Sequence, residues 1–374
     1  MSKIADLIAK YCPNGAKYSN LENIATVDTG KQLNKELLFD NGKYPVMNGG
    51  IYPSGRYNEY NTAKDNIAIS QGGASAGYVN WMTENFWAGA HCYTILLKNT
   101  DVLPKFLYYV LKSKQHDFMS SQQGAGIPSL SRKELNNLLI PIPPLPVQQE
   151  IVRILDSFAE LEAELEAELE ARKKQYEHYR DKLLNFADIS QGGVRTMAIS
   201  QLCEVSRGRV MSKDYLRENI GDYPVYSSQT ANNGELGKIN TFDYDGEFLT
   251  WTTDGANAGS VFYRNGKFSV TNVCGLLKAK SSDLNMKYLS YYLGMIAKQY
   301  VSAGMGNPKL MSNVMGKIQV IIPPLAEQER IVAILDKFDA LVNDISDGLP
   351  AEINARRQQY EYYRDKLLSF PMAA

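Results

Sequence analysis

Two glycine-rich polar loops are the segments of this chain best suited to contact a ligand. They read SQGGASAG (Ser70 to Gly77) and TTDGANAG (Thr252 to Gly259), and each follows an apolar run typical of a β-strand. Glycine lets a backbone approach a ligand closely, and short polar side chains can hydrogen-bond to the edges of nucleic-acid bases. Ordinary turns have the same composition, so that alternative stays open. The candidate base-reading residues are Ser70, Gln71, Ser75, Thr252, Thr253, Asp254 and Asn257.

The charges of the chain are unevenly distributed. The net charge is −1, yet residues 1–145 carry +3 and residues 194–325 carry +4, while residues 146–193 and 326–374 carry −5 and −3. This partition indicates different partners for the two kinds of segment, although ordinary variation of surface charge would also produce it. The candidate phosphate or base contacts in the basic segments are Lys31, Arg56, Arg209 and Lys309.

No catalytic motif accompanies these residues in the sequence. It contains no GxxxxGK[ST], no GxGxxG after a strand, no HExxH and no GxSxG. The repeated IPPL segment lacks the leading Asn or Asp and the aromatic residue of the amino-methyltransferase motif. The four cysteines and three histidines lack zinc-site spacing, and we predict that the cysteines are buried free thiols. We therefore expect a binding protein without a catalytic residue, metal or cofactor of its own.

The loops belong to a long internal repeat. Residues 142–186 begin IPPLPVQQEIVRILDSF and end ARKKQYEHYRDKLLNF, and residues 322–370 begin IPPLAEQERIVAILDKF and end ARRQQYEYYRDKLLSF. Weaker matches join the segments between these copies: FLYYVLKS from Phe106 with YLSYYLGM from Tyr288, and GAGIPSLS from Gly124 with GMGNPKLM from Gly304. Two copies of one large unit predict an internal pseudo-twofold.

Each copied segment predicts a long helix. Apolar residues recur at intervals of three and four, as in a coiled-coil seam, and the helix length is about 40 residues, or roughly 60 Å. We expect the two helices to pack antiparallel, with Gly348 and Pro350 dividing the second into two pieces. From Leu161 the first helix carries repeats of Leu-Glu-Ala-Glu. The tails are rich in aromatic and basic residues that suit a protein interface: Tyr176, Tyr179, Arg180, Tyr360, Tyr363 and Arg364.

The predicted fold class is α+β. Two α/β domains alternate with two long antiparallel helices that form a coiled coil. Strands are predicted at residues 66–70, 93–97, 247–251 and 273–277, and a helix closes each globule at residues 106–114 and 288–298. The predicted divisions are residues 1–145, 146–190, 191–325 and 326–374, in the order globule, helix, globule, helix.

This layout resembles the specificity subunit of type I restriction–modification systems, over nearly the whole chain. The resemblance rests on IPPLxxQxxIVxILDxF and QYxxYRDKLLxF, each present twice, and on the Leu-Glu-Ala-Glu repeat. It implies two target recognition domains that each read half of a bipartite, gapped site in double-stranded DNA. It implies helices that set the gap and dock two methylation subunits, which bring S-adenosylmethionine. Restriction subunits, where present, bring ATP and Mg²⁺.

Two other functions remain open at this point. One is a coiled-coil scaffold that does not bind DNA, and the other is an enzyme that modifies nucleic acid. The sequence has no run of 18 apolar residues and no signal-peptide pattern at its start, so we expect a cytoplasmic protein without a membrane span.

Overall fold

The computed structural model describes residues 2–120, 128–186, 193–302, 306–343 and 348–373. The chain divides into two compact units. Unit 1 consists of Met1–Ala167 and Glu352–Ala374, and unit 2 consists of Glu168–Ala351. Unit 1 therefore draws on both ends of the chain, and unit 2 is its middle. Each unit contains one globule and parts of two helices, whereas the predicted divisions separate globules from helices.

The globule of unit 1 is built on a four-stranded antiparallel sheet in the described residues, with the strand order β2-β8-β5-β6. A smaller sheet has the order β4-β3-β7, and β1 pairs with β9. The strands are β1 (Lys17–Asn20), β2 (Ala25–Thr29), β3 (Tyr44–Met47), β4 (Arg56–Tyr57), β5 (Asn66–Ser70), β6 (Val79–Met82), β7 (Trp87–Ala88), β8 (Cys92–Leu97) and β9 (Leu139–Ile142). The helices are α1 (Ser2–Tyr11), α2 (Leu21–Ile24), η1 (Lys35–Leu37), α3 (Pro104–Ser113), α4 (Gln115–Ser120) and α5 (Arg132–Asn136).

The globule of unit 2 has one larger sheet, in the order β11-β16-β14-β15-β12-β13, and β10 pairs with β17. The strands are β10 (Arg195–Ala198), β11 (Cys203–Arg207), β12 (Ile220–Tyr226), β13 (Glu235–Ile239), β14 (Tyr244–Thr252), β15 (Val261–Val270), β16 (Cys274–Ala279) and β17 (Gln319–Ile322). The helices are α7 (Ile199–Leu202), α8 (Lys213–Glu218), η2 (Ala231–Gly234), α9 (Met286–Ile296), η3 (Ala297–Tyr300) and α10 (Ser312–Met315). The four predicted strands and both closing helices are confirmed, as is the α+β class.

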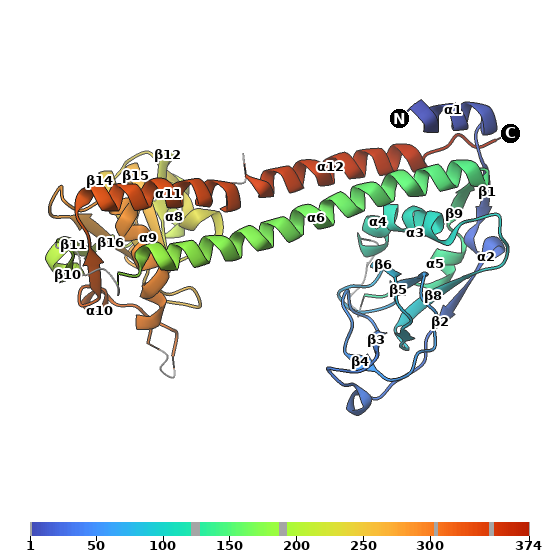
Figure 1. Cartoon of the computed structure of the whole chain (residues 1–374), viewed down its shortest axis with the longest axis horizontal. Coiled ribbons are helices and arrows are strands. Elements are labelled where there is room, and N and C mark those ends of the chain that lie inside the picture. The colour runs from blue at the N-terminus through green and yellow to red at the C-terminus, as the bar shows by residue number, and fades with distance from the viewer. Residues whose placement is uncertain (1, 121–127, 187–192, 303–305, 344–347, 374) are drawn as a thin grey trace. The chain divides into compact units, whose positions relative to one another are not determined.

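The long helices are α6 (Leu145–Leu184), α11 (Leu325–Asn343) and α12 (Leu349–Leu368). Proline pairs end β9 and β17 and precede α6 and α11, because proline cannot donate to a strand ladder but suits the first turn of a helix. Pro350 lies in the first turn of α12, so the predicted division of the second arm is confirmed. Figure 1 shows α6 beside α12 in unit 1 and beside α11 in unit 2.

Equivalent aromatic contacts hold the helices together in each unit. In unit 1 the rings of Phe158 and Tyr363 stack with centroids 5.7 Å apart, and in unit 2 the rings of Phe338 and Tyr179 stack at 5.6 Å. Arg357 of α12 pairs with Glu162 and Glu166 of α6. Phe158 of α6 contacts Tyr363, whereas Glu162 and Glu166, which come later in α6, pair with Arg357, which comes earlier in α12. The two helices are therefore antiparallel.

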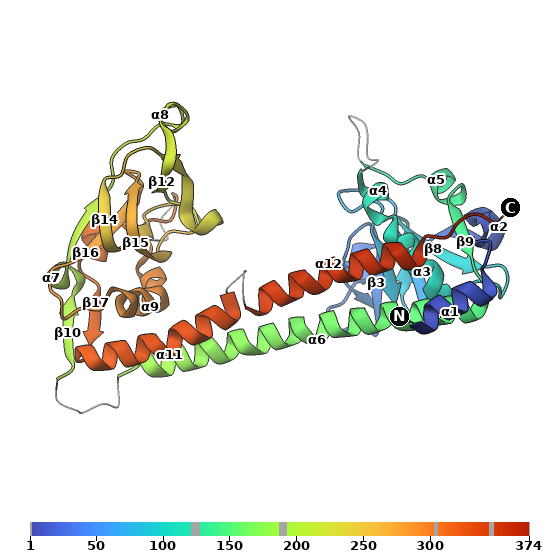
Figure 2. The same cartoon turned by 90° about the horizontal axis from the view of Figure 1, so that it is seen from above.

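One helix of each globule lies between the sheet and the long helices. In unit 1, α3 packs against β5 and β6 on one side and bonds to α6 on the other; in unit 2, α9 packs against β14, β15 and α11 (Figures 1 and 2). Their apolar faces join strands and the long helices in the larger hydrophobic cluster of each unit. Each unit also has a second, smaller cluster within its globule. The four cysteines are free and buried in these globules, as predicted.

The two ends of the chain meet within unit 1. The Ala16 amide donates to the Pro371 carbonyl at 2.9 Å, and the Tyr18 hydroxyl donates to the Phe370 carbonyl at 2.7 Å. Leu367, Leu368 and Phe370 are buried in the same core as Ile151 and Leu155 of α6. The C-terminal segment therefore completes the core of the unit that the N-terminal segment begins.

Within the described residues, no helix is both long enough and apolar enough to cross a membrane.

Candidate nucleic-acid interface

The two polar loops have the same backbone fold. In the first loop the Gly77 amide donates to the Ser70 carbonyl at 2.8 Å, and in the second the Gly259 amide donates to the Thr252 carbonyl at 2.9 Å. Both loops have left-handed glycines at equivalent places, with φ angles of +90° at Gly77 and +82° at Gly259. A side chain would be strained in that conformation, so the repeated glycines specify the turn.

A second segment closes each loop. The Leu130 amide donates to the Gln71 carbonyl at 2.8 Å, and the Leu310 amide donates to the Thr253 carbonyl at 2.9 Å. An isolated bridge also pairs Asp254 with Lys309. These contacts join the loops to the GAGIPSLS and GMGNPKLM segments, of which residues 124–127 and 304–305 lie outside the described residues. The described residues of these two segments therefore lie against the loops in their own globules.

Three predicted base-reading residues support the loops from within. Ser70, Thr252 and Thr253 are only 2%, 1% and 2% exposed. The Ser70 hydroxyl donates to the Gly50 carbonyl at 3.0 Å, the Thr253 hydroxyl donates to the Val273 carbonyl at 2.8 Å, and the Thr252 hydroxyl donates to the Asn257 carbonyl. Buried hydroxyls need such partners, and these bonds occupy their only donors. The prediction that these three side chains face a ligand is therefore corrected.

The other four predicted base-reading residues lie nearer the surface. Gln71, Ser75 and Asp254 are partly exposed, and Asn257 is exposed. The side-chain amide of Asn257 donates to the Thr230 hydroxyl at 3.1 Å, so the Asn257 side chain is held by the segment that follows β12. These side chains retain polar atoms that can bond to bases, and they remain candidates for base contacts.

Lys31 and Arg209 occupy equivalent positions beside the loops. Each follows a glycine whose amide bonds to the strand across the sheet: Gly30 to the Cys92 carbonyl at 3.0 Å and Gly208 to the Cys274 carbonyl at 3.4 Å. A Cβ atom on either glycine would collide with a backbone carbonyl, of Ala88 or of Val270. Both basic residues are exposed.

The two positions differ in their charge partners. Arg209 pairs with Asp243 at 3.0 Å and donates to the Tyr215 hydroxyl at 3.2 Å. These hydrogen bonds raise the pKa of Arg209, whereas hydrogen bonding to Arg209 lowers the pKa of Tyr215. Among the described residues, no carboxylate pairs with Lys31 or with the exposed Lys309.

Arg56 has a structural role in this conformation. Its guanidinium donates to the Gly42 carbonyl at 2.7 Å and the Lys43 carbonyl at 2.8 Å, and it pairs with Glu84 at 3.1 Å. It therefore ties the β3–β4 region together. The candidate phosphate or base contact at Arg56 stays a prediction, although its Nε and Nη2 atoms already have partners inside the protein.

The segments after β3 and β12 lie near the loops, and the sequence reasoning did not include them among the candidate contacts. In unit 1 the side-chain oxygen of Asn48 accepts from the His91 amide at 3.1 Å, and Tyr52 is 80% exposed. In unit 2, Asn232 and Asn233 adopt left-handed backbone angles near the loop. The matched Tyr-Pro-Val triplets at residues 44–46 and 223–225 directly precede these two segments. Aligning the two copies of the repeat at these triplets would have identified both segments from the sequence.

The predicted partner-binding residues lie mostly within the helix pairs. Tyr176, Tyr360 and Tyr363 are half-buried, and Tyr179 is 39% exposed while it stacks on Phe338. Arg180 and Arg364 pair with the neighbouring aspartates, Asp181 and Asp365. The expectation that these tails are too exposed to serve a single seam is corrected, since their rings form part of that seam.

A repeated polar joint fixes each globule on its helix. Asp156 of α6 accepts from the Tyr109 hydroxyl and pairs with Lys105 at 3.4 Å. Asp336 of α11 accepts from the Tyr291 hydroxyl at 2.7 Å and pairs with Lys287 at 2.6 Å. Burial raises the pKa of both phenols, and the hydrogen bonds to the carboxylates add to the shift, so both phenols stay neutral donors.

A buried glutamine anchors the start of each arm. The Gln148 side chain bonds to the Asp101 and Pro143 carbonyls, both at 2.7 Å, and accepts from the Leu103 amide at 2.8 Å. The Gln328 side chain makes the same three bonds in unit 2, at 3.0, 2.8 and 2.8 Å. The IPPLxxQ segment thus encodes a junction between globule and helix, and the sequence reasoning did not assign it that role.

Comparison with known proteins identifies the family. The family model described as the type I restriction modification DNA specificity domain matches residues 13–171 and 192–355. A Mycoplasma pneumoniae protein named as a type I specificity subunit is 43% identical over 249 residues, covering 65% of this chain and 91% of its own. A Haemophilus influenzae protein named as a type I restriction enzyme specificity subunit is 34% identical over 316 residues, covering 78% of each chain.

A solved structure has the same fold. The S subunit of a type I restriction–modification system from M. genitalium superposes with a TM-score of 0.64 at 22% identity, covering 94% of this chain and 96% of that one. With two family matches that align with the two globules and their arms, this chain belongs to the type I restriction–modification DNA specificity family.

Proposed function

We propose that this chain reads a bipartite DNA site for a type I restriction–modification complex and performs no chemistry itself. The supporting observation is that the two loops share one backbone fold while their side chains differ. Gln71 stands where the second loop has Thr253, and Asp254 stands where the first loop has Gly72. Shared geometry with different donors and acceptors suits two surfaces that read different base sequences. Each globule then reads one half-site.

The partners follow from the same division of labour. The repeated tails of the arms provide two equivalent surfaces, which suits two methylation subunits that bring S-adenosylmethionine. Restriction subunits, where present, bring ATP and Mg²⁺, and the complex acts in the cytoplasm. Phosphate contacts from Lys31, Lys309 and their neighbours supplement those made by the partners.

Exchange of one globule tests the assignment of half-sites. Residues 17–142, which run from β1 to β9, are replaced by the matching segment of a relative with a different site. The paired strands keep the junction intact because they begin and end the exchanged segment together. We expect one half of the methylated motif to change, as measured by sequencing the methylome. Exchange of residues 195–322 is the matched control and should change the other half. A change of both halves from one exchange would contradict the proposal.

The helices are proposed to set the gap between half-sites. Removal of one Leu-Glu-Ala-Glu unit, Leu165 to Glu168, shortens α6 by about one turn, or roughly 6 Å. Because base pairs rise about 3.4 Å along each strand, the gap should shrink by at most about two base pairs. Both half-sites should stay the same. A variant that methylates with the original gap would identify the helices as a scaffold only.

A further inference from the structure

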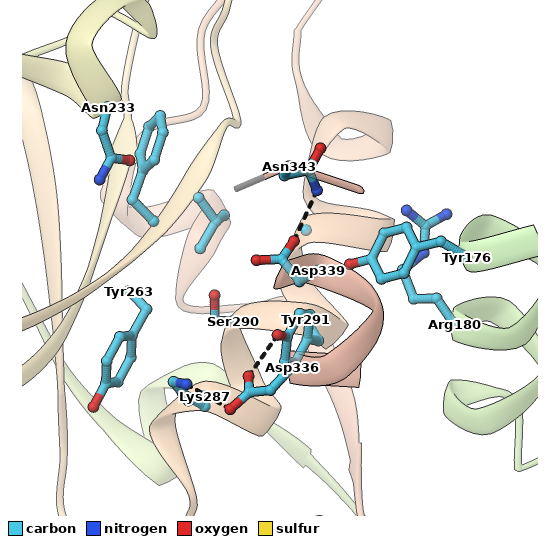
Figure 3. A pocket seen from close by; sticks show the side chains of 13 residues that line it. Tyr176, Arg180, Asn233, Tyr263, Lys287, Ser290, Tyr291, Asp336, Asp339 and Asn343 are labelled. Atoms are coloured by element: carbon cyan, nitrogen blue, oxygen red, sulfur yellow. Dashed lines mark hydrogen bonds and ion pairs between the residues drawn. The ribbon is translucent and has the colours of Figure 1, made fainter. Parts of the chain in front are cut away.

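A cavity of about 560 Å³ opens between α9, α11 and α6 within unit 2. Figure 3 shows Tyr176 and Arg180 entering from α6, opposite Asn233 and Tyr263. The acidic side chains of Asp336 and Asp339 line the cavity from α11. Two small residues, Ser290 and Gly294, line it from α9. The cavity therefore lies beside the joint between globule and arm.

The corresponding place in unit 1 is filled by the protein itself. Tyr108 and Lys112 of α3 stand where α9 has Ser290 and Gly294. The Tyr108 ring lies 5.6 Å from the ring of Trp81, the counterpart of Tyr263. Burial raises the pKa of Tyr108, and the charges of Tyr360 and Asp156 raise it further. Tyr360 and Asp156 are the counterparts of Tyr176 and Asp336, so Tyr108 occupies the equivalent space.

Lys112 also occupies part of the space in unit 1 that corresponds to the cavity. Burial and, to a lesser extent, the nearby charge of Arg364, the counterpart of Arg180, together lower the pKa of Lys112 to about 8. In unit 2, by contrast, a Cβ atom on Gly294 would meet no atom within 4 Å. The cavity thus exists because α9 has two small residues where α3 has two large ones.

Unit 2 also has a carboxylate that unit 1 lacks. Asp339 stands where α6 has Ala159. The Asp339 carboxylate accepts a hydrogen bond from the side-chain amide of Asn343 at 2.8 Å. The other charges that line the cavity have partners: Lys287 pairs with Asp336 and Arg180 pairs with Asp181. Within the described residues, no lysine or arginine pairs with Asp339. Burial of Tyr176 and, to a lesser extent, the negative charge of Asp339 raise the pKa of Tyr176 to about 12.

We propose that this cavity receives a lysine or arginine side chain of one methylation subunit, paired with Asp339. The inference rests on the proposed function and goes beyond it, because it makes the two docking surfaces unequal. A cationic side chain matches the charge of Asp339, and Lys112 shows that unit 1 places an ammonium group in the equivalent region. DNA phosphates would be repelled by the same carboxylate.

The test is a stepwise titration of the intact chain with its cognate methylation subunit, followed by native mass spectrometry and calorimetry. Asp339→Asn keeps the size of the side chain and removes its charge. We expect one of the two binding steps to weaken about tenfold or more, as for the loss of a desolvated charge pair, with the other step unchanged. Glu329→Gln, at an exposed carboxylate on the same helix that does not line the cavity, is the matched control and should change neither step.

A second variant fills the cavity from within. Ser290→Tyr combined with Gly294→Lys gives unit 2 the side chains of unit 1, and it should favour a one-to-one complex while the chain stays folded. Fluorescence of Trp251, the tryptophan of unit 2, reports on folding. Equal weakening of both binding steps, or unchanged binding in both variants, would overturn this inference and leave the proposed function intact. A wild-type chain that binds no methylation subunit would overturn the proposed function as well.

Discussion

Units 1 and 2 agree where a globule meets its arm and differ where it faces outward. Gln148 and Gln328 make the same three hydrogen bonds, and Asp156 and Asp336 receive equivalent tyrosine and lysine partners. The loops after β5 and β14 keep their backbone but not their side chains, and the cavity of unit 2 is filled in unit 1. Repetition thus marks the junctions between globule and arm, and divergence marks the loops and the cavity.

The strongest test of this comparison removes the anchoring glutamines. Gln148→Ala and Gln328→Ala should each lower the free energy of unfolding of their own unit by about 2 to 3 kcal/mol, because several buried polar groups lose partners. Urea unfolding followed at Trp251 for unit 2, and at Trp81 and Trp87 for unit 1, measures both effects. The exposed Gln149→Ala should change stability by less than about 0.5 kcal/mol. A large effect in one unit alone would break the equivalence of the joints.

The next test sharpens the contrast between the loops. Gln71→Ala and Asp254→Ala should each relax recognition of one base pair, by about 2 kcal/mol, if their side chains bond to bases. The two changes should affect opposite half-sites. Binding of the assembled methyltransferase to a panel of single-base variants reports both. Unchanged specificity in the double variant would count against the loops as the reading surface.

A smaller effect is expected at the tyrosine–aspartate joints. Tyr109→Phe and Tyr291→Phe remove one hydroxyl donor to a carboxylate, and each should destabilise its unit by about 1.5 kcal/mol. We also expect each variant to methylate sites with a wider range of gap lengths, because the globule is held less firmly on its arm. Sequencing of the methylome measures the range of gaps. Retention of a single gap would limit these bonds to stability.

The smallest effect concerns a charge cluster in unit 1. Hydrogen bonds from Arg153 and Lys3 lower the pKa of the buried Glu150 to about 2. Because its pKa in the unfolded chain is about 4.3, this stabilisation is present above that pH and is lost as the pH falls towards about 2. Its size is about 1 kcal/mol, since both cationic partners are exposed and screened. Glu150→Gln should flatten the acid dependence of unit 1, as seen in unfolding curves from pH 5 to pH 2.5. Unit 2 is the internal control, because Arg330 replaces Glu150 there.

The sequence predicted the repeated helices, the division of the second arm and the matched loops, because periodicity, proline and glycine act over a few residues. It did not predict the burial of Ser70 or Thr253, whose hydroxyl partners, Gly50 and Val273, come from other segments. Nor did it reveal the cavity. The exchange of Tyr108 for Ser290 is visible in the aligned repeats, but its effect depends on what Trp81 and Tyr263 pack against in three dimensions.

The meeting of the chain ends in unit 1 sets an order for folding during synthesis. The Tyr18 hydroxyl bonds to a carbonyl 352 residues further along the chain. At about 5 to 20 residues per second, a ribosome needs about 20 to 70 s to make that interval. All of unit 2 is synthesised in that time, while Ile151 and Leu155 still await Leu367 and Leu368. The middle of the chain can therefore finish folding first, whereas the core of unit 1 is completed only after α12 has been synthesised.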